Sequence, residues 1–301
     1  MTDEYFGGLD FGSSGARISI INYCKEIIFE DSCNYKYEFK NPEGWINSCI
    51  ELFKGVPKKI KINLSKLSIS GTSGTLVPCN LNGEFLGNSI PYNEACNSNS
   101  KQLNLIAGDD KFLNNQYSSL AKAIKLIDTF GENIILRHQS DWITGWFLND
   151  WSYGEEGNNI KLGWDIASKS WPKSFDSLSL KKSVPLIKES GIILGKISQS
   201  IAKKLGTNEN LLLIAGTTDS NAAFIAAQIK ENEGLTVLGT TIVLKKIIKE
   251  TFTHPGITMH KVNGDWICGG ASNAGCGILS KFFSDLEIEE LSQQINPRKK
   301  T

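Results

Sequence analysis

The sequence predicts an α/β protein built of two lobes. Three observations favour this fold class: short strands that alternate with helical segments, a length of 301 residues, and two similar hairpins around positions 9–15 and 238–241. A chain of this length usually needs more than one hydrophobic core. Because each hairpin opens one half of the chain, the repeat indicates a duplicated domain.

Apolar runs and turn residues place the elements along the first half. Strands are expected at 5–9, 16–22 and 66–70, with Gly/Ser/Thr turns after the first and third. Apolar residues at helical spacing predict a helix over 118–130. The segment 149–176 is rich in Trp, Gly and Asn and is expected to form loops with short elements. The segment 191–205 fits a strand that enters a helix.

The second half repeats the strand–turn plan. A buried strand is expected at 211–215, a turn at 216–219 and an Ala-rich helix over 220–228. Charge and a glycine at 230–234 indicate a domain boundary, which divides the chain into 1–233 and 234–301. Strands follow at 235–238, 242–248 and 266–268, and an amphipathic helix is expected to begin near Ala274.

Composition excludes several classes of protein. Lys plus Arg equals Asp plus Glu at 32 each, so no net charge attracts nucleic acid and no such partner is expected. The seven cysteines form no CxxC pair, which argues against a zinc site or a disulfide framework and favours a reducing compartment. The chain has no signal-peptide pattern and no apolar run near the roughly 20 residues that cross a bilayer. We therefore expect a cytoplasmic protein with no membrane partner.

The first hairpin carries candidate phosphate ligands. Gly12 and Gly15 let the backbone turn tightly and approach a ligand, and Ser13 and Ser14 add hydroxyl groups beside exposed N–H groups. Asp10, at the end of the strand, offers the hard oxygen that Mg²⁺ prefers. The alternative is an ordinary Gly/Ser turn with no ligand.

The second hairpin offers the opposing clamp. Gly239, Thr240 and Thr241 have the same small, hydroxyl-bearing character as the first turn. Two such hairpins can hold one phosphate chain from both sides, which makes the pair a stronger signal than either turn alone.

Asp219 is the candidate general base. It lies between a strand and an Ala-rich helix, and a helix N-terminus favours the ionised carboxylate. In phosphoryl transfer a modest base that orients and deprotonates a hydroxyl group is sufficient. The alternative is a helix N-cap, a position that favours Asp.

Two further segments suit a polyol ligand. Thr72, Ser73 and Gly74 place hydroxyl groups and bare backbone after a strand, although they also fit a plain turn. Asp141 beside Trp142 would supply a carboxylate and an aromatic wall; the alternative, which the pattern slightly favours, is a helix surface and a core tryptophan.

Taken in order, these segments resemble the FGGY carbohydrate kinases, a branch of the actin-like ATPase fold. The resemblance rests on the segments 10–17, 71–74, 139–142, 159–165, 216–220, 238–241 and 269–273. It covers nearly the whole chain, and it is the combination rather than any single motif that is specific. The likeness is greatest to a short ribulose- or xylulose-kinase-like subgroup.

The resemblance implies a fold, a reaction and a set of roles. The fold is a ribonuclease-H-like first lobe, complete to about Glu233, with an incomplete second lobe. The reaction is transfer of the ATP γ-phosphate, with Mg²⁺, to a sugar, with ribulose ahead of xylulose and other polyols. Asp219 would be the base, and Asp10 the magnesium-side carboxylate. Residues Gly269, Gly270 and Asn273 would begin the nucleotide side.

The family continues beyond the position of Thr301, and this departure leaves alternatives open. The chain would then be a natural truncation, a cut fragment, or one half of a split gene whose partner is a separately encoded C-terminal segment. One rival function is a sugar-binding fragment that does not turn over. Another is an actin-like or chaperone-type ATPase without a small-molecule acceptor, against which the sugar-side matches argue. The oligomeric state is not readable from the sequence.

Overall fold

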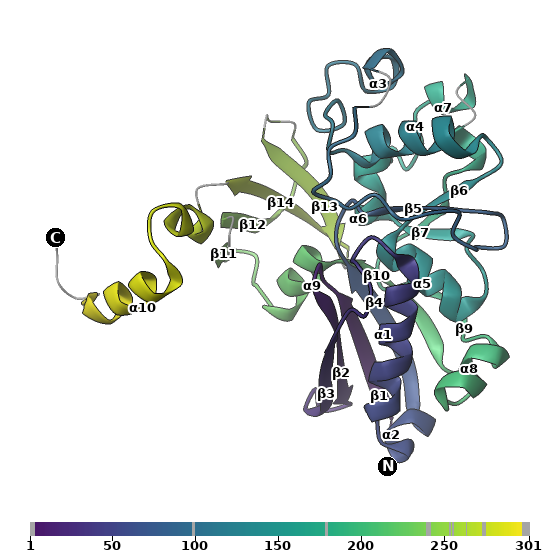
Figure 1. Ribbon diagram of the computed structural model, residues 1–301, viewed down its shortest axis with the longest axis vertical. Helices are drawn as coiled ribbons and strands as arrows, with labels where there is room; N and C mark the ends of the chain where they lie inside the picture. Colours follow the sequence, from purple (N-terminus) through teal and green to yellow (C-terminus); the bar gives the residue numbers. More distant parts are fainter. Residues whose placement is uncertain are drawn as a thin grey trace. The chain divides into compact units, whose positions relative to one another are not determined.

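The computed structural model describes residues 4–97, 100–177, 180–238, 242–252, 254, 256–262, 264–272 and 275–296. The chain divides into two compact units, Met1–Ala223 and Phe224–Thr301, and each is described by itself. The predicted α/β class is confirmed, since strands and helices alternate along the first unit (Figure 1).

The first unit is organised by a six-stranded sheet in the order β3-β2-β1-β4-β10-β9. Its strands are β1 (Tyr5–Phe11), β2 (Gly15–Asn22), β3 (Ile27–Asn34), β4 (Leu64–Gly71), β9 (Ile193–Lys196) and β10 (Leu212–Thr218). Strands β1, β4 and β10 run parallel, whereas β2, β3 and β9 pair antiparallel with their neighbours. The predicted hairpin at the start of the chain is therefore confirmed as β1–β2.

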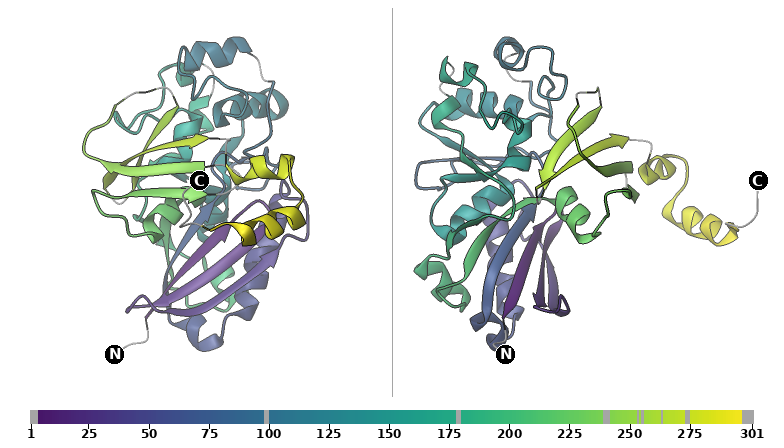
Figure 2. Two further views of the ribbon diagram at one scale, coloured as in Figure 1. Left: turned by 90° about the vertical axis from the view of Figure 1, so that its left-hand side faces the viewer. Right: turned by 180° about the vertical axis from the view of Figure 1, so that it is seen from behind.

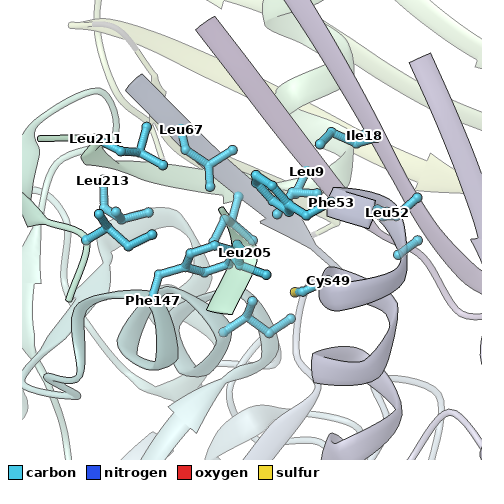
Figure 3. Packing of buried hydrophobic residues seen from close by; sticks show 14 of the residues in the cluster. Leu9, Ile18, Cys49, Leu52, Phe53, Leu67, Phe147, Leu205, Leu211 and Leu213 are labelled. Atoms are coloured by element: carbon cyan, nitrogen blue, oxygen red, sulfur yellow. The ribbon is translucent and has the colours of Figure 1, made fainter. Parts of the chain in front are cut away.

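Helices bury one face of this sheet. They are α1 (Pro42–Gly55), α2 (Lys58–Ile62), α5 (Gln139–Leu148) and α8 (Gln199–Leu205). Helix α1 lies across the strands in Figure 1, and the same strands lie in front of it in the rear view of Figure 2. Leu9 and Leu67 from the sheet meet Phe53 of α1, Phe147 of α5 and Leu205 of α8 in one buried core (Figure 3). Removing this apolar surface from water is the main force that holds the helices on the sheet.

A second core lies under the polar loops of the first unit. It joins the two-stranded sheet of β5 (Leu76–Cys79) and β6 (Ile135–His138) to α3 (Ser100–Ala107) and α4 (Ser119–Phe130). The predicted helix over 118–130 is confirmed, and Ser118 caps it by accepting a hydrogen bond from the N–H of Ala121.

The segment expected to form loops with short elements does so. It contains β7 (Tyr153–Glu155), α6 (Glu156–Asn159), the 3₁₀ turn η1 (Ile160–Leu162) and α7 (Ser174–Ser177); η2 (Leu180–Lys182) and β8 (Leu186–Lys188) follow.

The second unit holds a four-stranded antiparallel sheet in the order β11-β12-β14-β13. Its elements are β11 (Gly234–Leu238), β12 (Ile242–Ile248), β13 (Ile257–Val262), β14 (Asp265–Ser272), η3 (Cys276–Lys281) and α10 (Asp285–Gln294). The hairpin β11–β12 confirms the predicted second hairpin. The expected helix near Ala274 is wrong: a 3₁₀ turn forms first, and α10 begins at Asp285 behind a capping box of Ser284 and Glu287.

The division between the two compact units falls within helix α9 (Asp219–Ala226). Helix α9 begins in the first unit, but Phe224 is buried with Val262 and Ile267 in the core of the second. The domain boundary expected after Glu233 rests on a charged, glycine-containing break at 230–234 and stays a prediction.

Strand β10 corrects another prediction. The sequence indicates a turn at 216–219, but the strand continues through Thr218 and the helix starts directly at Asp219. Its pairing with β4 shifts between Ile214 and Thr217, as in a β-bulge. A Cβ at Gly216 would lie 1.8 Å from the carbonyl oxygen of Ile69, so only glycine allows the two backbones to approach this closely.

Replacing Gly216 by alanine should destabilise the first unit by about 2–4 kcal/mol, because backbone on both strands must move to admit the methyl group. The matched control is Gly8→Ala in β1, where the nearest atom to a Cβ is 3.9 Å away. The control should change the free energy of unfolding by less than about 0.5 kcal/mol. Urea denaturation followed by circular dichroism measures both. Equal effects would contradict the close-approach argument.

Candidate active site

Three parallel strands end side by side in the first unit. Phe11 of β1 pairs with Gly71 of β4, and Gly71 pairs with Thr218 of β10. The residues that follow each strand therefore emerge at one edge of the sheet. In parallel α/β sheets this carboxyl edge is where ligands usually bind. The sequence-predicted residues Asp10, Thr72 and Asp219 all belong to this edge.

Asp10 is the second-to-last residue of β1 and is held from both sides. Its Oδ2 accepts a hydrogen bond from Nη1 of Arg17 at 3.0 Å, and its Oδ1 accepts one from Oγ of Ser70 at 3.0 Å. The side chain keeps 37% of its exposure, so oxygen lone pairs remain open to a ligand. Arg17 and Ser70 fix the carboxylate without covering it.

The turn after β1 is tight and anchored. The N–H of Gly12 donates to the carbonyl of Gly15 at 3.0 Å, and the hydroxyl of Tyr35 donates to the carbonyl of Gly12 at 2.7 Å. A Cβ at Gly15 would lie 2.3 Å from the carbonyl oxygen of Cys33, so a side chain does not fit there. Ser13 and Ser14 are exposed at the tip. The turn is thus a rigid loop that presents two hydroxyl groups.

The turn after β4 is fixed by three side chains from elsewhere. Oε1 of Gln139 accepts hydrogen bonds from the N–H and the hydroxyl of Thr72 at 2.9 and 2.8 Å. The carbonyl of Ser73 accepts from Nζ of Lys161 at 3.0 Å, and the carbonyl of Gly74 accepts from Nζ of Lys122 at 2.9 Å. Two successive carbonyls are therefore turned towards two ammonium groups.

The two lysines are unusual because both are largely buried. Lys122 has no exposed side chain, and its three N–H groups donate to the carbonyls of Gly74, Tyr92 and Tyr117. Burial, followed by the charge of Lys161, lowers the pKa of Lys122 to about 8. Burial also lowers the pKa of Lys161, and the opposing cause is the negative charge of Asp219.

Asp219 opens helix α9 at the end of β10 and is exposed. Its Oδ1 accepts a hydrogen bond from the N–H of Ser220 at 2.6 Å. The capping role considered for Asp219 falls instead to Thr218, whose hydroxyl accepts from the N–H of Asn221 at 3.3 Å. Asp219 is therefore a carboxylate at the sheet edge, at a helix N-terminus, within the electrostatic reach of Lys161.

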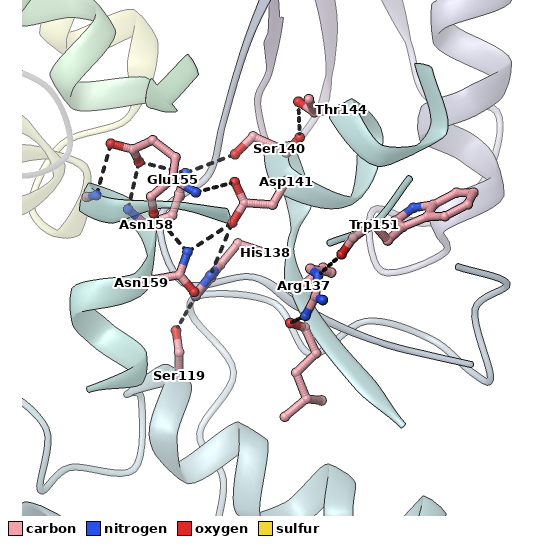
Figure 4. Close-up of polar contacts among 12 residues, drawn as sticks. Ser119, Arg137, His138, Ser140, Asp141, Thr144, Trp151, Glu155, Asn158 and Asn159 are labelled. Atoms are coloured by element: carbon pink, nitrogen blue, oxygen red, sulfur yellow. Dashed lines mark hydrogen bonds and ion pairs between the residues drawn. The ribbon is translucent and has the colours of Figure 1, made fainter. Parts of the chain in front are cut away.

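Asp141 lies beneath this edge, in a buried network shown in Figure 4. Its Oδ1 accepts from the N–H of Glu155 at 3.0 Å, and its Oδ2 accepts from Nδ2 of Asn159 at 3.1 Å. Asp141 is 7% exposed, and burial raises the pKa of its carboxyl group to about 7. Trp142 is 3% exposed; it packs against Trp45 in the core and against the more exposed ring of Phe85. Sugar contact by Asp141 stays a prediction, and the hydrogen bonds of this side chain are internal.

Glu155 is a residue that the sequence analysis missed. It caps α6 by accepting from the N–H groups of Gly157 and Asn158, and Thr217 of β10 donates to it at 3.4 Å. Burial, with a smaller contribution from Asp141, raises its pKa to about 8. The available signal was the run Glu155–Asn159, five polar or small residues inside a Trp-rich segment.

Four buried polar atoms in this region have no hydrogen-bond partner among the described residues: Nδ1 of His138, Nε2 of Gln139, Oδ1 of Asn158 and Oδ1 of Asn159. Nδ1 of His138 lies 3.9 Å from Oδ2 of Asp141, which is longer than a hydrogen bond (Figure 4). Buried polar groups are normally paired, so such a cluster indicates sites for water or for ligand hydroxyl groups.

The remaining predicted ligands belong to the second unit. The strand expected at 266–268 is longer than predicted, so Gly269 and Gly270 lie inside β14 and pair with residues of β12 and β13 on either side. Gly239, Thr240, Thr241 and Asn273 lie outside the described residues.

Among the described residues no group of three or more His, Cys, Asp or Glu side chains is placed to hold a metal ion. No helix in the described part of the chain is both long and apolar enough to span a bilayer.

The two buried carboxyl groups predict a pH dependence of stability. Both pKa values are raised on folding, so their contribution is fully present below about pH 4 and is lost as pH rises through about 7 and 8. Glu155→Gln cannot ionise and should reduce this loss between pH 5 and 8.5. The exposed Glu209→Gln is the control and should keep the wild-type slope. Urea denaturation at both pH values measures the free energy of unfolding of each protein. An identical change in this free energy with pH in all three proteins would contradict the buried-carboxyl argument.

No protein-family model matches the chain. Solved structures do. The chain is similar to a xylulose kinase from Lactobacillus acidophilus, with a TM-score of 0.80 and 16% identity over 97% of this chain and 66% of that one. A gluconate kinase from the same organism matches with a TM-score of 0.79 and 16% identity, over 98% of this chain and 66% of that one. Glycerol kinase from Plasmodium falciparum, solved with ADP, matches with a TM-score of 0.78 and 15% identity, over 97% of this chain and 67% of that one.

These comparisons establish the fold. At 15–16% identity the likeness is one of architecture, and it extends over nearly all of this chain. The chain spans about two thirds of the length of the kinases it matches. The expected ribonuclease-H-like, actin-like ATPase fold is therefore confirmed, in the form that sugar kinases use.

Proposed function

We propose that the chain acts in ATP-dependent phosphorylation of a sugar hydroxyl group, with a ketopentose as acceptor, D-ribulose ahead of xylulose, as in the short ribulose/xylulose-kinase-like subgroup. One observation carries the proposal. The parallel strands β1, β4 and β10 bring Asp10, the Ser73 turn and Asp219 to the same sheet edge, within a fold that sugar kinases share.

Asp219 is assigned as the general base. Its exposure lets it meet a substrate hydroxyl group, and the helix N-terminus and Lys161 both favour its ionised form. A carboxylate in this state accepts the proton of the attacking hydroxyl group as the phosphoryl group is transferred. Thr72, Ser73 and Gly74 are assigned to the acceptor side, where their turn is held rigid by Gln139 and the two lysines. Asp141 is assigned to the substrate pocket, where its buried hydrogen bonds to Glu155 and Asn159 would hold the carboxyl group in position.

The residues of the first unit also fit ATP and Mg²⁺. Asp10 retains open oxygen atoms, and Mg²⁺ needs only one or two carboxylates when phosphates and water complete its shell. The Gly12–Gly15 turn is narrow and anchored, with Ser13 and Ser14 at its tip for phosphate oxygens. When bound, Mg²⁺ would neutralise charge on the phosphates. The assignment of Gly239, Thr240, Thr241, Gly269, Gly270 and Asn273 to the nucleotide remains a proposal about the second unit.

A second candidate is a sugar-binding protein that does not turn over by itself. In that case a separately encoded segment would be the partner that completes nucleotide binding.

The substitution Asp219→Asn should lower the sugar-dependent rate by about 10²–10⁴-fold, because it removes the proton acceptor. Folding should survive, since Thr218 caps the helix and Asn keeps the shape. The measurement is coupled ADP release with Mg-ATP and a panel of D-ribulose, D-xylulose, glycerol and D-gluconate, and Asp176→Asn, another exposed helical Asp, is the control.

Thermal shift with each sugar is measured in parallel. Retained sugar binding without turnover in Asp219→Asn supports the base. A wild-type chain that binds sugar but releases no ADP favours the second candidate, and ADP release that ignores added sugars contradicts the kinase proposal.

Lys161 should matter through its charge. Lys161→Met should lower kcat/KM for the sugar and move the acidic limb of the pH–rate profile to higher pH, because the neighbouring carboxylate loses a stabilising positive charge. Lys161→Arg keeps the positive charge and should return the acidic limb most of the way to its wild-type position. The exposed Lys58→Met is the matched control. A rate loss with an unchanged pH profile would reduce Lys161 to a structural support of the Ser73 turn.

A further inference from the structure

A cavity of about 460 Å³ opens in the first unit away from the residues assigned above. Its wall is formed by the turn at Leu81 and Asn82, by Ile135 and Arg137 of β6, and by the segment from Asn149 to Ser152 that links α5 to β7. Asp10, Thr72–Gly74 and Asp219 do not line it. The kinase proposal therefore leaves this cavity without a role.

Arg137 is the chemical centre of the cavity. The residue is only 4% exposed. Its Nε donates to the carbonyl of Trp151, and its Nη1 donates to the carbonyls of Leu136 and Ser183 at 2.7 and 2.9 Å. Within the described chain no acceptor is bonded to Nη2, which carries no dashed line in Figure 4. Two N–H groups of a nearly buried guanidinium are thus available to a ligand.

The comparison with Lys122 shows why this matters. Lys122 is the other deeply buried cation beside β5–β6, and three carbonyls take all three of its N–H groups. Its contacts are complete, as expected for a purely structural role. Arg137 uses three of its five donors in the same way and keeps two.

The charge of Arg137 has no direct ion pair among the described residues, and the carboxylates of Asp141 and Asp150 act on it only from beyond ion-pair distance. Burial lowers its pKa to about 10, so the side chain remains cationic at neutral pH. Buried charges are normally paired, so a cation that lines a cavity calls for an anion there.

The other walls indicate a hydroxylated ligand. Asp150 uses Oδ1 to accept from the N–H and hydroxyl of Ser152 at 2.9 and 2.6 Å, and its second oxygen accepts no hydrogen bond from the residues that the structure describes. Asn82 and Asn149 add amide groups at the exposed rim. A carboxylate and amides around an open rim suit hydroxyl groups, whereas Asp150 would repel a bare polyanion.

Trp151 supplies a fixed apolar wall. Its Nε1 donates to the carbonyl of Trp142 at 3.0 Å. A Cβ at Gly83 or Gly145 would lie 2.0 or 2.3 Å from atoms of its ring, so both glycines are needed to seat the indole. The wall is therefore formed before any ligand binds.

We propose that this cavity is a binding site for a small hydroxylated anion, a sugar acid or a sugar monophosphate, whose anionic group pairs with Nη2 of Arg137. The hydroxyl groups of the ligand meet Asp150, Asn82 and Asn149 at the rim. The site is separate from the carboxyl edge of the sheet and does not depend on the kinase proposal.

The test is isothermal titration of the full chain with D-gluconate, D-ribose 5-phosphate and inorganic phosphate at constant ionic strength, with neutral ribitol for comparison. Gluconate and the sugar phosphate should bind saturably, and ribitol should not. Leu81→Glu places a negative charge at the rim on a residue that is 74% exposed, and it should weaken binding at least about fivefold. Leu186→Glu makes the same change at a leucine that is 65% exposed and should leave binding unchanged.

Asp150→Asn keeps the oxygen that Ser152 uses and removes the competing charge, so it should tighten binding of both hydroxylated anions. These variants leave the Arg137 contacts intact and do not depend on removing a buried side chain. Equal affinity in Leu81→Glu and Leu186→Glu would overturn the proposal, as would saturation by ribitol. Absence of saturable binding up to about 10 mM would also overturn it. Loss of binding in Asp219→Asn but not in Leu81→Glu would place the anion at the kinase edge and overturn it as well.

Discussion

The parallel pairing of β1, β4 and β10 is the constraint on which the rest of the structure depends. A one-residue slip in a strand would turn every side chain to the opposite face. The register that pairs Phe11 with Gly71, and Gly71 with Thr218, is what places three polar segments at one edge. Close packing of Gly216 against Ile69 is part of the same pairing, since no larger residue allows that approach.

Beneath the edge, buried polar groups replace the apolar packing found elsewhere. Asp141, Glu155 and Asn159 bond to one another, and Lys122 and Lys161 hold the carbonyls of the turn after β4. Such a network costs desolvation energy and is stable only when its members are satisfied. Its value lies in orientation: each contact fixes a backbone segment that ends at the sheet edge. Several buried amide and imidazole atoms of this region lack a hydrogen-bond partner among the described residues, and buried atoms of this kind are normally bound by water or a ligand.

Two buried cations of the first unit, Lys122 and Arg137, show how similar surroundings support different roles. Both Lys122 and Arg137 donate to backbone carbonyls, and both have a pKa lowered by burial. An ammonium group has three donors and a guanidinium has five, so three carbonyls exhaust the one and not the other. A planar, permanently charged group with donors to spare is suited to hold an anion, which is the basis of the proposed second site.

Sequence patterns were sufficient for local structure. The hairpin around Gly12–Gly15, the capped helix after Ser118 and the two strands around residues 239–241 follow from turn chemistry and periodicity, which act over a few residues. The order of motifs also indicated the actin-like fold, which the structural similarity to solved sugar kinases confirms. Patterns failed at Gly216–Thr218 and near Ala274, where close backbone approach and a distant capping box decide the outcome.

By itself the sequence determined the fold class, the hairpins and the residue types at the strand ends. Only the tertiary structure decided that Thr218 rather than Asp219 caps α9 and that the hydrogen bonds of Asp141 are internal. It alone also showed that Glu155, Lys161 and Arg137 are buried or partly buried charged groups bonded to distant segments. The physical reason is that burial, charge pairing and hydrogen bonding join residues far apart in the chain. Lys161 meets Ser73, and Arg137 meets Ser183, through contacts that no local pattern records.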